Sequence, residues 1–262
     1  MPADHPGAEA YEGFIGRWSR MVAREFLGWL SLPPHLRWLD VGCGTGALTA
    51  AILESSRPQR ACGVDLSGEY VSFVRKSFPA RRCGFAVADA GALPFGGARF
   101  DVAVSGLTLN LVPAPRAAVA EMARVIEPGG VVAAYVWDFA AGMQLFRFFW
   151  DVATELNPRA AGLDQANVFS WCTPEGLRTL FEGAALEGVG VRAIQVPLEF
   201  ARFEDYWTPL LSGHGRLPGY VMSLDASERA ALREGLRVRL PTRPDGSIHL
   251  AARAWAVRGS PP

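Results

Sequence analysis

The chain has 262 residues, half of them hydrophobic, and its 26 basic side chains balance its 26 acidic ones. A neutral chain of this kind lacks the basic surface that nucleic-acid binding requires, so we expect no nucleic-acid partner. One sizeable core can form at this length, and we predict a single domain. The opening residues lack a basic stretch followed by an apolar one, so we expect no signal peptide and a cytoplasmic location.

Two further features of the composition exclude other classes of protein. The apolar run Val131–Trp150 is interrupted by Asp138, Gly142 and Arg147, so we predict a strand followed by a helix and no stable membrane insertion. The cysteines show neither paired spacing nor nearby histidines, so we expect reduced thiols and no metal. They are Cys43, Cys62, Cys83 and Cys172.

Residues 38–46 read Trp-Leu-Asp-Val-Gly-Cys-Gly-Thr-Gly, an apolar strand that ends in an acid and a glycine-rich turn. A helix-like run follows at Ala47–Leu53, so backbone N–H groups at the helix start can face a ligand. Glycine allows positive φ and lets a ligand approach without a Cβ in the way. The pattern predicts a loop that holds a nucleotide or nucleoside. Its members are Gly42, Cys43 as a small packing residue, Gly44 and Gly46.

Asp40 lies immediately before these glycines. Its carboxylate would repel a pyrophosphate at the helix start and attract an ammonium or sulfonium cation. The acid therefore favours S-adenosylmethionine over NAD. Gly42, Gly44 and Ala47 also satisfy the looser dinucleotide pattern G-x-G-x-x-(G/A), so the loop alone leaves an NAD-dependent oxidoreductase open.

The next two predicted strands also end in acids. Residues 60–66 form an apolar run that ends at Asp65, where a carboxylate accepts hydrogen bonds from ribose hydroxyls. Residues 85–95 place Asp89 and Ala90 at the end of a third strand, where an acid can accept from an adenine amino group. Both acids indicate a nucleoside.

Two more strands complete this half of the chain. Phe100–Gly106 is the fourth, and a helical segment then leads to Glu127-Pro128-Gly129-Gly130 and a fifth strand at Val131–Trp137. The elements follow one another in the order that a doubly wound sheet demands.

The chain resembles the class I S-adenosylmethionine-dependent methyltransferases, and within them the small-molecule branch that includes the ubiquinone and menaquinone biosynthesis methyltransferases. The resemblance covers residues 36–137 well and the rest loosely. It implies a Rossmann-like, doubly wound α/β fold with a seven-stranded, mainly parallel sheet, helices on both faces and helical cap insertions. The motifs that carry it are Leu39–Gly46, Gly63–Ser67, Asp89-Ala90 with Leu93-Pro94-Phe95, Phe100-Asp101 and Pro128-Gly129-Gly130.

The resemblance also assigns roles to single residues around S-adenosylmethionine and its product S-adenosylhomocysteine. The glycines would pass under the methionine part, Asp65 would hold the ribose, and Ser105 would lie near the transferable methyl. Asp89 and Ala90 would meet the adenine. The predicted cofactor-binding residues are Tyr11, Arg17, Asp40, Gly42, Cys43, Gly44, Gly46, Asp65, Leu66, Asp89, Ala90 and Ser105.

Residues 11–20 resemble the leading helix of the family. They could fold over the cofactor, with Tyr11 or Arg17 reaching the methionine carboxylate, since arginine pairs with carboxylates in bidentate fashion. Alternatively Phe14 and Trp18 only pack and Arg17 is solvated. We therefore divide the predicted domain into an N-terminal helical lid at 1–30, a cofactor-binding core at 36–137, and substrate-cap insertions at 139–172 and 197–246.

The insertions should define the substrate. Residues 142–157 predict a helix with a wide apolar face, which either packs on the sheet or lines an apolar pocket. Thr173-Pro174 should open another helix, and strands are predicted at Val189–Val196 and Ile248–Val257. The helical segment at 197–246 is either a second cap or an ordinary surface insertion. The predicted substrate-binding residues are Asn110, Trp137, Phe146, Phe149, Trp150 and Tyr206.

Methyl transfer by in-line displacement depends mainly on positioning and on excluding water. A general base is needed only for an acceptor that arrives protonated, and His214 and Asp138 are the candidates. His214 could equally be an exposed loop residue. We expect a small, apolar or aromatic acceptor that reacts at oxygen, carbon or nitrogen. The alternatives are an NAD-dependent oxidoreductase and a non-catalytic S-adenosylmethionine-binding protein, and the oligomeric state stays open.

Overall fold

The structure is a computed structural model that describes residues 12–78, 81–213 and 215–262. No helix within these ranges is both long and apolar enough to span a bilayer. Tyr11 and His214, two of the predicted site residues, lie outside the described residues.

The residues group into two compact units. The core unit comprises Ser19–Val136, Trp171–Ile194 and Trp255–Pro262. The insertion unit comprises the residues up to Trp18 together with Trp137–Ser170 and Gln195–Ala254. The segments predicted as cap insertions therefore fall mainly in one unit, and the prediction of a single domain stays a prediction.

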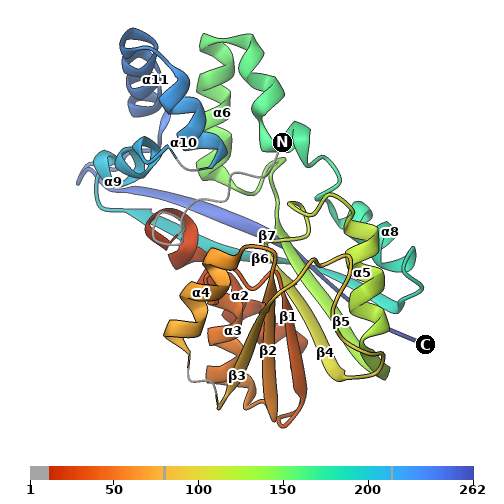
Figure 1. The fold of residues 1–262 in the computed structure, drawn as a ribbon. Coiled ribbons are helices and arrows are strands. Elements are labelled where there is room, and N and C mark those ends of the chain that lie inside the picture. The colour runs from red at the N-terminus through yellow and green to blue at the C-terminus, as the bar shows by residue number, and fades with distance from the viewer. Residues whose placement is uncertain (1–11, 79–80, 214) are drawn as a thin grey trace. The chain divides into compact units, whose positions relative to one another are not determined.

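A mainly parallel sheet organises the chain, and the described residues supply seven strands in the order β3-β2-β1-β4-β5-β7-β6 (Figure 1). The pairs β1 with β2, β1 with β4, β2 with β3 and β4 with β5 are all parallel. The predicted Rossmann-like fold is confirmed. The strands are β1 Arg37–Val41, β2 Arg60–Asp65, β3 Cys83–Val87, β4 Phe100–Gly106, β5 Ile126–Trp137, β6 Glu187–Phe200 and β7 Ile248–Ser260.

The strand order reverses its direction of growth between β1 and β4. In open parallel sheets ligands bind outside the carboxyl ends of the strands at such a switch point. The glycine-rich loop follows β1, so the topology puts it at this position. The helices of the core unit are α2 Arg17–Leu30, which begins two residues before the unit, α3 Ala47–Ala51 continued by η2 Ile52–Ser56, α4 Gly68–Ser77, α5 Pro115–Arg124 and α8 Pro174–Glu182.

The helix starts follow from local side-chain chemistry. Thr173 accepts a hydrogen bond from the Gly176 amide at 3.1 Å with Pro174 next in the chain, which confirms the predicted cap of α8. The insertion unit is largely helical, as expected. Its helices are η1 Glu12–Gly16, α6 Gln144–Leu156, η3 Pro158–Leu163, α7 Gln165–Val168, α9 Phe203–Trp207, η4 Thr208–Leu211, α10 Arg216–Ser223 and α11 Ala226–Arg239.

Several strand boundaries differ from the prediction, and three of the differences affect the reading of the site and the insertions. β3 ends at Val87, so Asp89 lies in the turn beyond it. β5 begins at Ile126 because a register shift absorbs the Pro-Gly-Gly segment into the strand. β6 continues to Phe200, so residues 197–200, predicted as the start of a helical cap, belong to a strand. Exposed and buried side chains alternate across Pro197, which an edge strand tolerates.

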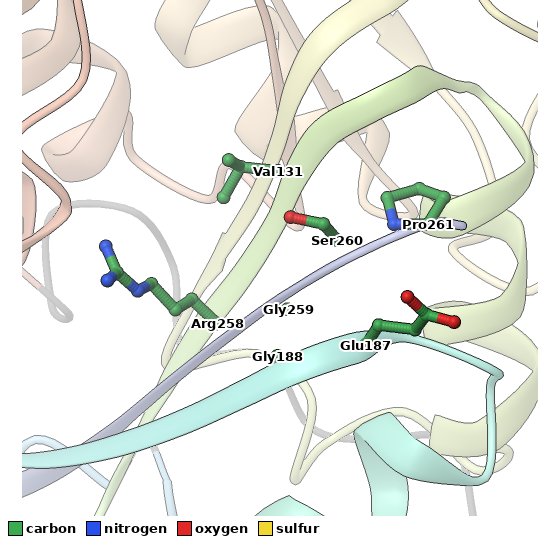
Figure 2. Close-up of a pocket in the computed structure, with 7 residues that line it drawn as sticks. All are labelled: Val131, Glu187, Gly188, Arg258, Gly259, Ser260 and Pro261. Carbon is green, nitrogen blue, oxygen red and sulfur yellow. The ribbon is translucent and has the colours of Figure 1, made fainter.

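Two hollows lie toward the amino ends of the parallel strands of the sheet. One of about 450 Å³ is lined by Val131 and by residues from the start of β6 and the end of β7, including Glu187 and Arg258 (Figure 2). Val131 pairs with Val102, and Val102 pairs with Trp38 near the start of β1. The other hollow, of about 470 Å³, is lined by Trp38 itself. None of the predicted cofactor residues lines either of them, so neither is the candidate site.

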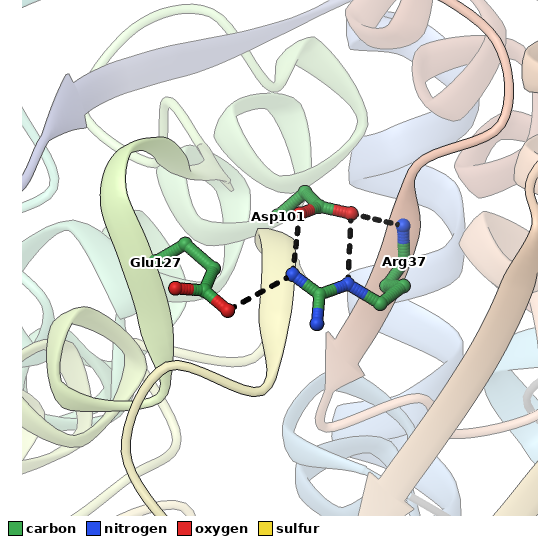
Figure 3. A network of polar contacts seen from close by, with 3 residues as sticks. All are labelled: Arg37, Asp101 and Glu127. Atoms are coloured by element: carbon green, nitrogen blue, oxygen red, sulfur yellow. Dashed lines mark hydrogen bonds and ion pairs between the residues drawn. The ribbon is translucent and has the colours of Figure 1, made fainter.

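An ion-pair network fastens the amino ends of three strands (Figure 3). Arg37 of β1 donates from Nη2 and Nε to the two carboxylate oxygens of Asp101 in β4, at 2.6 and 3.1 Å, and its backbone amide adds a bond of 2.7 Å. The same guanidinium reaches Glu127 of β5 at 3.2 Å. Hydrogen bonding to Arg37 lowers the pKa of Asp101. Bidentate, charge-assisted contacts of this kind are among the stronger polar interactions.

We expect Arg37→Gln to lower the free energy of unfolding by about 1–2 kcal/mol, because three strands lose a shared partner. Urea denaturation measures this loss. Arg24→Gln is the control, since Arg24 and Glu54 form a 3.4 Å pair with more than 60% of each side chain exposed. Its removal should cost less than about 0.5 kcal/mol. Equal losses in the two variants would contradict the assignment.

Candidate cofactor site

The glycine-rich loop bends back over the end of β2. The backbone amides of Gly42 and Cys43 both donate to the Val64 carbonyl, at 2.8 and 2.9 Å, and the Gly46 amide donates to the Cys43 carbonyl at 2.8 Å. These bonds turn the chain sharply between β1 and α3. Cys43 is 6% exposed, and burial raises the pKa of its thiol, so the side chain is a packing residue as predicted.

The three glycines of the loop are required for different reasons. A Cβ at Gly42 would lie 2.1 Å from the Thr108 side chain, and a Cβ at Gly46 would lie 2.6 Å from the Phe78 ring. Gly44 has φ +51° and open space where a Cβ would stand. The positive φ accounts for glycine at position 44 and the space beside it is open, whereas packing against the protein is a further reason for glycine at the other two positions.

Asp65 joins the loop to the start of α4. Its Oδ2 accepts from the Gly44 amide at 2.9 Å and its Oδ1 accepts from the Ser67 amide at 2.8 Å. The residue is 8% exposed. Each carboxylate oxygen has a second lone pair, so the predicted bonds to two ribose hydroxyls remain available. The structural role that Asp65 also plays depends on tertiary contacts and was missed in the sequence analysis.

Asp40 is buried beneath the loop. The Thr49 hydroxyl donates to its Oδ2 at 2.6 Å, while Oδ1 has no hydrogen-bond partner among the described residues. Burial raises the pKa of Asp40 to about 7, the Thr49 bond opposes this, and the negative charge of Asp65 adds to it. The side chain therefore changes charge near neutral pH, and only its ionised form can attract a cation.

This titration predicts a pH-dependent stability. Between its ordinary pKa of 3.8 and the folded value of about 7, Asp40 holds a proton in the folded state that it loses on unfolding. The free energy of unfolding should therefore fall as pH rises through this window, by up to about 1.4 kcal/mol per pH unit. The measurement is urea denaturation of the wild type and Asp40→Asn at pH 4.5, 6 and 8.

Subtracting the two free energies cancels the titration of other groups. The wild type should lose stability relative to Asp40→Asn across the window and then stay level above it. A difference between the two proteins that does not change with pH would contradict the assignment of this titration to Asp40.

Two exposed apolar side chains lie near Asp65 and Asp89, the two acids predicted to contact a nucleoside. Leu66 follows Asp65 and is 63% exposed, and Val87 pairs with Asp65 across the strands and is 55% exposed. Asp89 lies in the exposed turn beyond Val87 and accepts from the Gly91 amide at 2.8 Å through Oδ1. An apolar surface beside an acceptor suits a purine ring. Val87 was missed from the sequence, where it reads as an ordinary strand residue.

The end of β4 meets the glycine loop. Ser105 is fully buried and donates to the Val41 carbonyl at 2.8 Å, so it joins β4 to β1, and its predicted position near the methyl stays a prediction. Thr108 donates to the Gly42 carbonyl at 2.9 Å and also to Gly106 at 3.1 Å. Asn110, a predicted substrate residue, is half-buried in the turn that follows.

Within the insertion unit, Asp138 is engaged in structural contacts. Its Oδ2 lies 2.7 Å from Nε and 2.5 Å from Nη2 of Arg253, and its Oδ1 accepts from the Ala141 amide at 3.2 Å. Asp138 is 3% exposed. Both carboxylate oxygens are engaged in these contacts, so the geometry favours a structural role over that of the predicted general base.

The predicted aromatic substrate residues form the interior of the insertion unit. Phe149 and Trp150 contact Tyr220 with ring centroids 6.0 and 5.5 Å apart. The Trp150 indole donates to Gln165 at 2.5 Å, and the Tyr206 hydroxyl donates to the Leu145 carbonyl at 2.9 Å. These contacts join helices of the insertion unit to one another, and the substrate-binding roles of these side chains stay predictions. All five are at most 7% exposed, namely Trp137, Phe146, Phe149, Trp150 and Tyr206.

Arg17 has an exposed guanidinium that stacks on aromatic rings. Its Cζ lies 4.2 Å from the centroid of Trp18 and 5.3 Å from that of Phe200, and Nη2 donates to the Glu199 carbonyl at 3.3 Å. These contacts leave most of its donors available, and the predicted bond to a methionine carboxylate stays a prediction.

No group of three or more potential metal ligands occurs among the described residues. The four cysteines are free thiols.

Part of the chain is similar in sequence to known proteins. Residues 39–134 match the methyltransferase domain family. The malonyl-acyl-carrier-protein O-methyltransferase of Hahella chejuensis is 37% identical over 92 residues, which are 35% of this chain and 33% of that protein. The 2-methyl-6-phytyl-1,4-hydroquinone methyltransferase of Synechocystis is 30% identical over 203 residues, which are 74% of this chain and 62% of that protein. The chain thus spans only a third of the first relative and less than two thirds of the second.

A solved structure shows the same fold. The phosphoethanolamine N-methyltransferase 2 of Haemonchus contortus, in complex with S-adenosyl-L-methionine, superposes with a TM-score of 0.58 at 17% identity. The superposition covers 98% of this chain and 57% of that one.

Proposed function

We propose that this chain, which carries a methyltransferase domain at residues 39–134, binds S-adenosylmethionine and transfers its methyl group to a small molecule. One observation carries the proposal: Asp65 fixes the open Gly44 by a 2.9 Å bond and also stands beside the exposed Leu66 and Val87. The carboxyl end of β2 thus offers the surroundings that a nucleoside with an attached methionine needs.

The residues present fit this cofactor. Gly44 leaves space above the loop, the spare lone pairs of Asp65 can accept ribose hydroxyls, and Asp89 is exposed beside the apolar pair. The unpartnered Oδ1 of Asp40 is a buried acceptor in the same loop region.

The bound cofactor would supply an electrophilic methyl on a sulfonium. The task of the protein is then to hold the two reactants in line and to exclude water. The ionised form of Asp40 favours the positive charge before transfer more than the neutral thioether after it. We do not assign Asp138 as a general base, because Arg253 binds its carboxylate. His214 remains a candidate base outside the described residues.

The proposed acceptor is a small apolar or aromatic molecule. A hydroquinone is the acceptor in the name of the relative with 74% of this chain aligned, which supports an aromatic hydroxyl or ring carbon. The balanced charge of the chain supports a small-molecule acceptor over nucleic acid. Free thiols fit a reducing compartment, so we place the protein in the cytoplasm.

Isothermal titration with S-adenosylmethionine, S-adenosylhomocysteine and NAD tests cofactor choice. Binding of both sulfur nucleosides without NAD is expected, and binding of NAD alone would overturn the proposal.

Asp65→Ala should weaken the binding of S-adenosylhomocysteine about 5- to 150-fold through the loss of two hydrogen bonds. Turnover is then measured as S-adenosylhomocysteine release with hydroquinones, phenols and fatty acids. Tight binding without release for any acceptor class would favour the non-catalytic alternative.

The charge of Asp40 predicts a second, pH-dependent result. The ratio of affinities for S-adenosylmethionine over S-adenosylhomocysteine should rise severalfold from pH 6 to 8, because only the former is a sulfonium cation and Asp40 ionises in this range. In Asp40→Asn the ratio should stay flat. A rise of equal size in the variant would show that another group is responsible.

A further inference from the structure

The turn that carries Asp89 follows Ala88, whose amide donates to the Asp65 carbonyl of β2 at 3.0 Å. β3 ends at Val87, and the turn closes through the Gly91 amide on the Asp89 carboxylate at 2.8 Å and the Ala92 amide on the Asp89 carbonyl at 3.1 Å. These bonds lie within the turn and cannot place it relative to the sheet. The position of Asp89 therefore depends on the Ala88 bond before it and on what holds residues 93–95 after it.

Two side chains of α5 hold these residues through their backbone. The Leu93 amide donates to Oε2 of Glu121 at 2.8 Å, and Arg124 donates to the Leu93 carbonyl at 3.2 Å. Arg124 also donates to the Phe95 carbonyl at 2.8 Å. Both backbone groups of Leu93 are thus satisfied by one helix, in the way that a neighbouring strand would satisfy them.

Glu121 and Arg124 are also bound to each other. Arg124 donates from Nε and Nη2 to the two carboxylate oxygens of Glu121, at 2.6 and 2.7 Å. The hydrogen bond to Arg124 lowers the pKa of Glu121, so the pair stays charged at neutral pH. A guanidinium held in this way keeps its remaining N–H groups pointed at the carbonyls of Leu93 and Phe95.

Apolar contacts support the same segment from its inner side. Leu93 is 5% exposed, and the Phe95 ring packs on Phe100 of β4 with centroids 5.1 Å apart. At Gly91 a Cβ would lie 3.7 Å from the Cβ of Ala117 on α5. The turn therefore packs against α5 along its length, and the charged pair fixes its register there.

From these contacts we infer that Glu121 and Arg124 are positioning residues for recognition of the cofactor's base. By fixing the backbone of Leu93 and Phe95 they hold Asp89 where its carboxylate accepts from the adenine amino group. The inference rests on the proposed binding of an S-adenosyl cofactor. Glu121 and Arg124 themselves do not touch the cofactor, so they set selectivity for the base and not the chemistry.

Selectivity for the amino group is a readout that a merely structural pair would not change. A carboxylate held in place binds a ligand with the amino donor more tightly. A ligand without this donor leaves the carboxylate without a hydrogen bond. When the turn is free to shift, only the ligand with the amino donor loses a hydrogen bond, so the preference for it shrinks. The test compares S-adenosylhomocysteine with its purine analogue that lacks the 6-amino group, by isothermal titration.

We expect the wild type to prefer the adenine compound by at least about tenfold, as one charged hydrogen bond implies. Arg124→Met should reduce this preference to less than about threefold, mainly by weakening the adenine compound. Hydrogen exchange at the Leu93 amide should accelerate in the same variant. Arg124→Lys, which keeps the charge but not the fork, should give an intermediate preference and serves if the Met variant fails to fold.

Arg178→Met is the matched control. Arg178 of α8 donates to the Val189 carbonyl at 2.7 Å and lies 3.9 Å from Glu182 in its own helix, so its loss also removes a tie from a helix to backbone. Its preference for the adenine compound should equal that of the wild type.

The outcomes separate the inference from the proposed function. Full wild-type preference in both Arg124 variants, or an equal loss of affinity for both ligands, would overturn the inference. A wild type that binds S-adenosylhomocysteine without preferring it over the analogue would also overturn it and leave the proposed function standing. A wild type that binds neither compound would overturn the proposed function itself.

Discussion

The carboxylate of Asp65 is the contact on which the site depends. It accepts the Gly44 amide with one oxygen and the Ser67 amide with the other, and so joins the glycine loop to the start of α4. A parallel sheet leaves its strand ends without partners of their own, and this acid supplies them at the switch point. The loop takes its ligand-facing form only because a neighbouring strand ends in an acid at the right level.

Asp40 places an opposite demand on the same loop. Its carboxyl is 2% exposed and has one oxygen without a partner, which costs stability once the group ionises. A positive ligand close to the loop would offset that cost. Under the proposed function, the ionised carboxyl would favour a positively charged ligand over a neutral or anionic one.

Much of the core unit could be predicted from the sequence because its signals are local. The bounds of β4 agree with the prediction, and the cap at Thr173 follows from two adjacent residues. The end of β6 could not be read in this way, since Pro197 interrupts a pattern that an edge strand nevertheless continues. Hydrophobic periodicity shows that α6 has a wide apolar face but not what that face contacts, and the structure fills it with core aromatics.

The residues that act through backbone atoms were the hardest to foresee. Glu121 and Arg124 have the ordinary spacing of a surface ion pair, and only the path of residues 93–95 reveals what they bind. Val87 likewise acquires a role because its strand stops one residue before the turn of Asp89 begins. Sequence patterns identify the acids that approach a ligand, whereas the groups that hold those acids in place depend on tertiary contacts.

Thr108 has a consequence for how the loops move. Its methyl group occupies the space that a side chain at Gly42 would need, and its hydroxyl binds the carbonyl of that same glycine. Leu107 beside it holds a positive φ of 58°, an unfavourable conformation for a branched side chain. The segment after β4 and the glycine loop are thereby interlocked at Gly42 by packing and by a hydrogen bond. We therefore expect a displacement of either segment to strain the other.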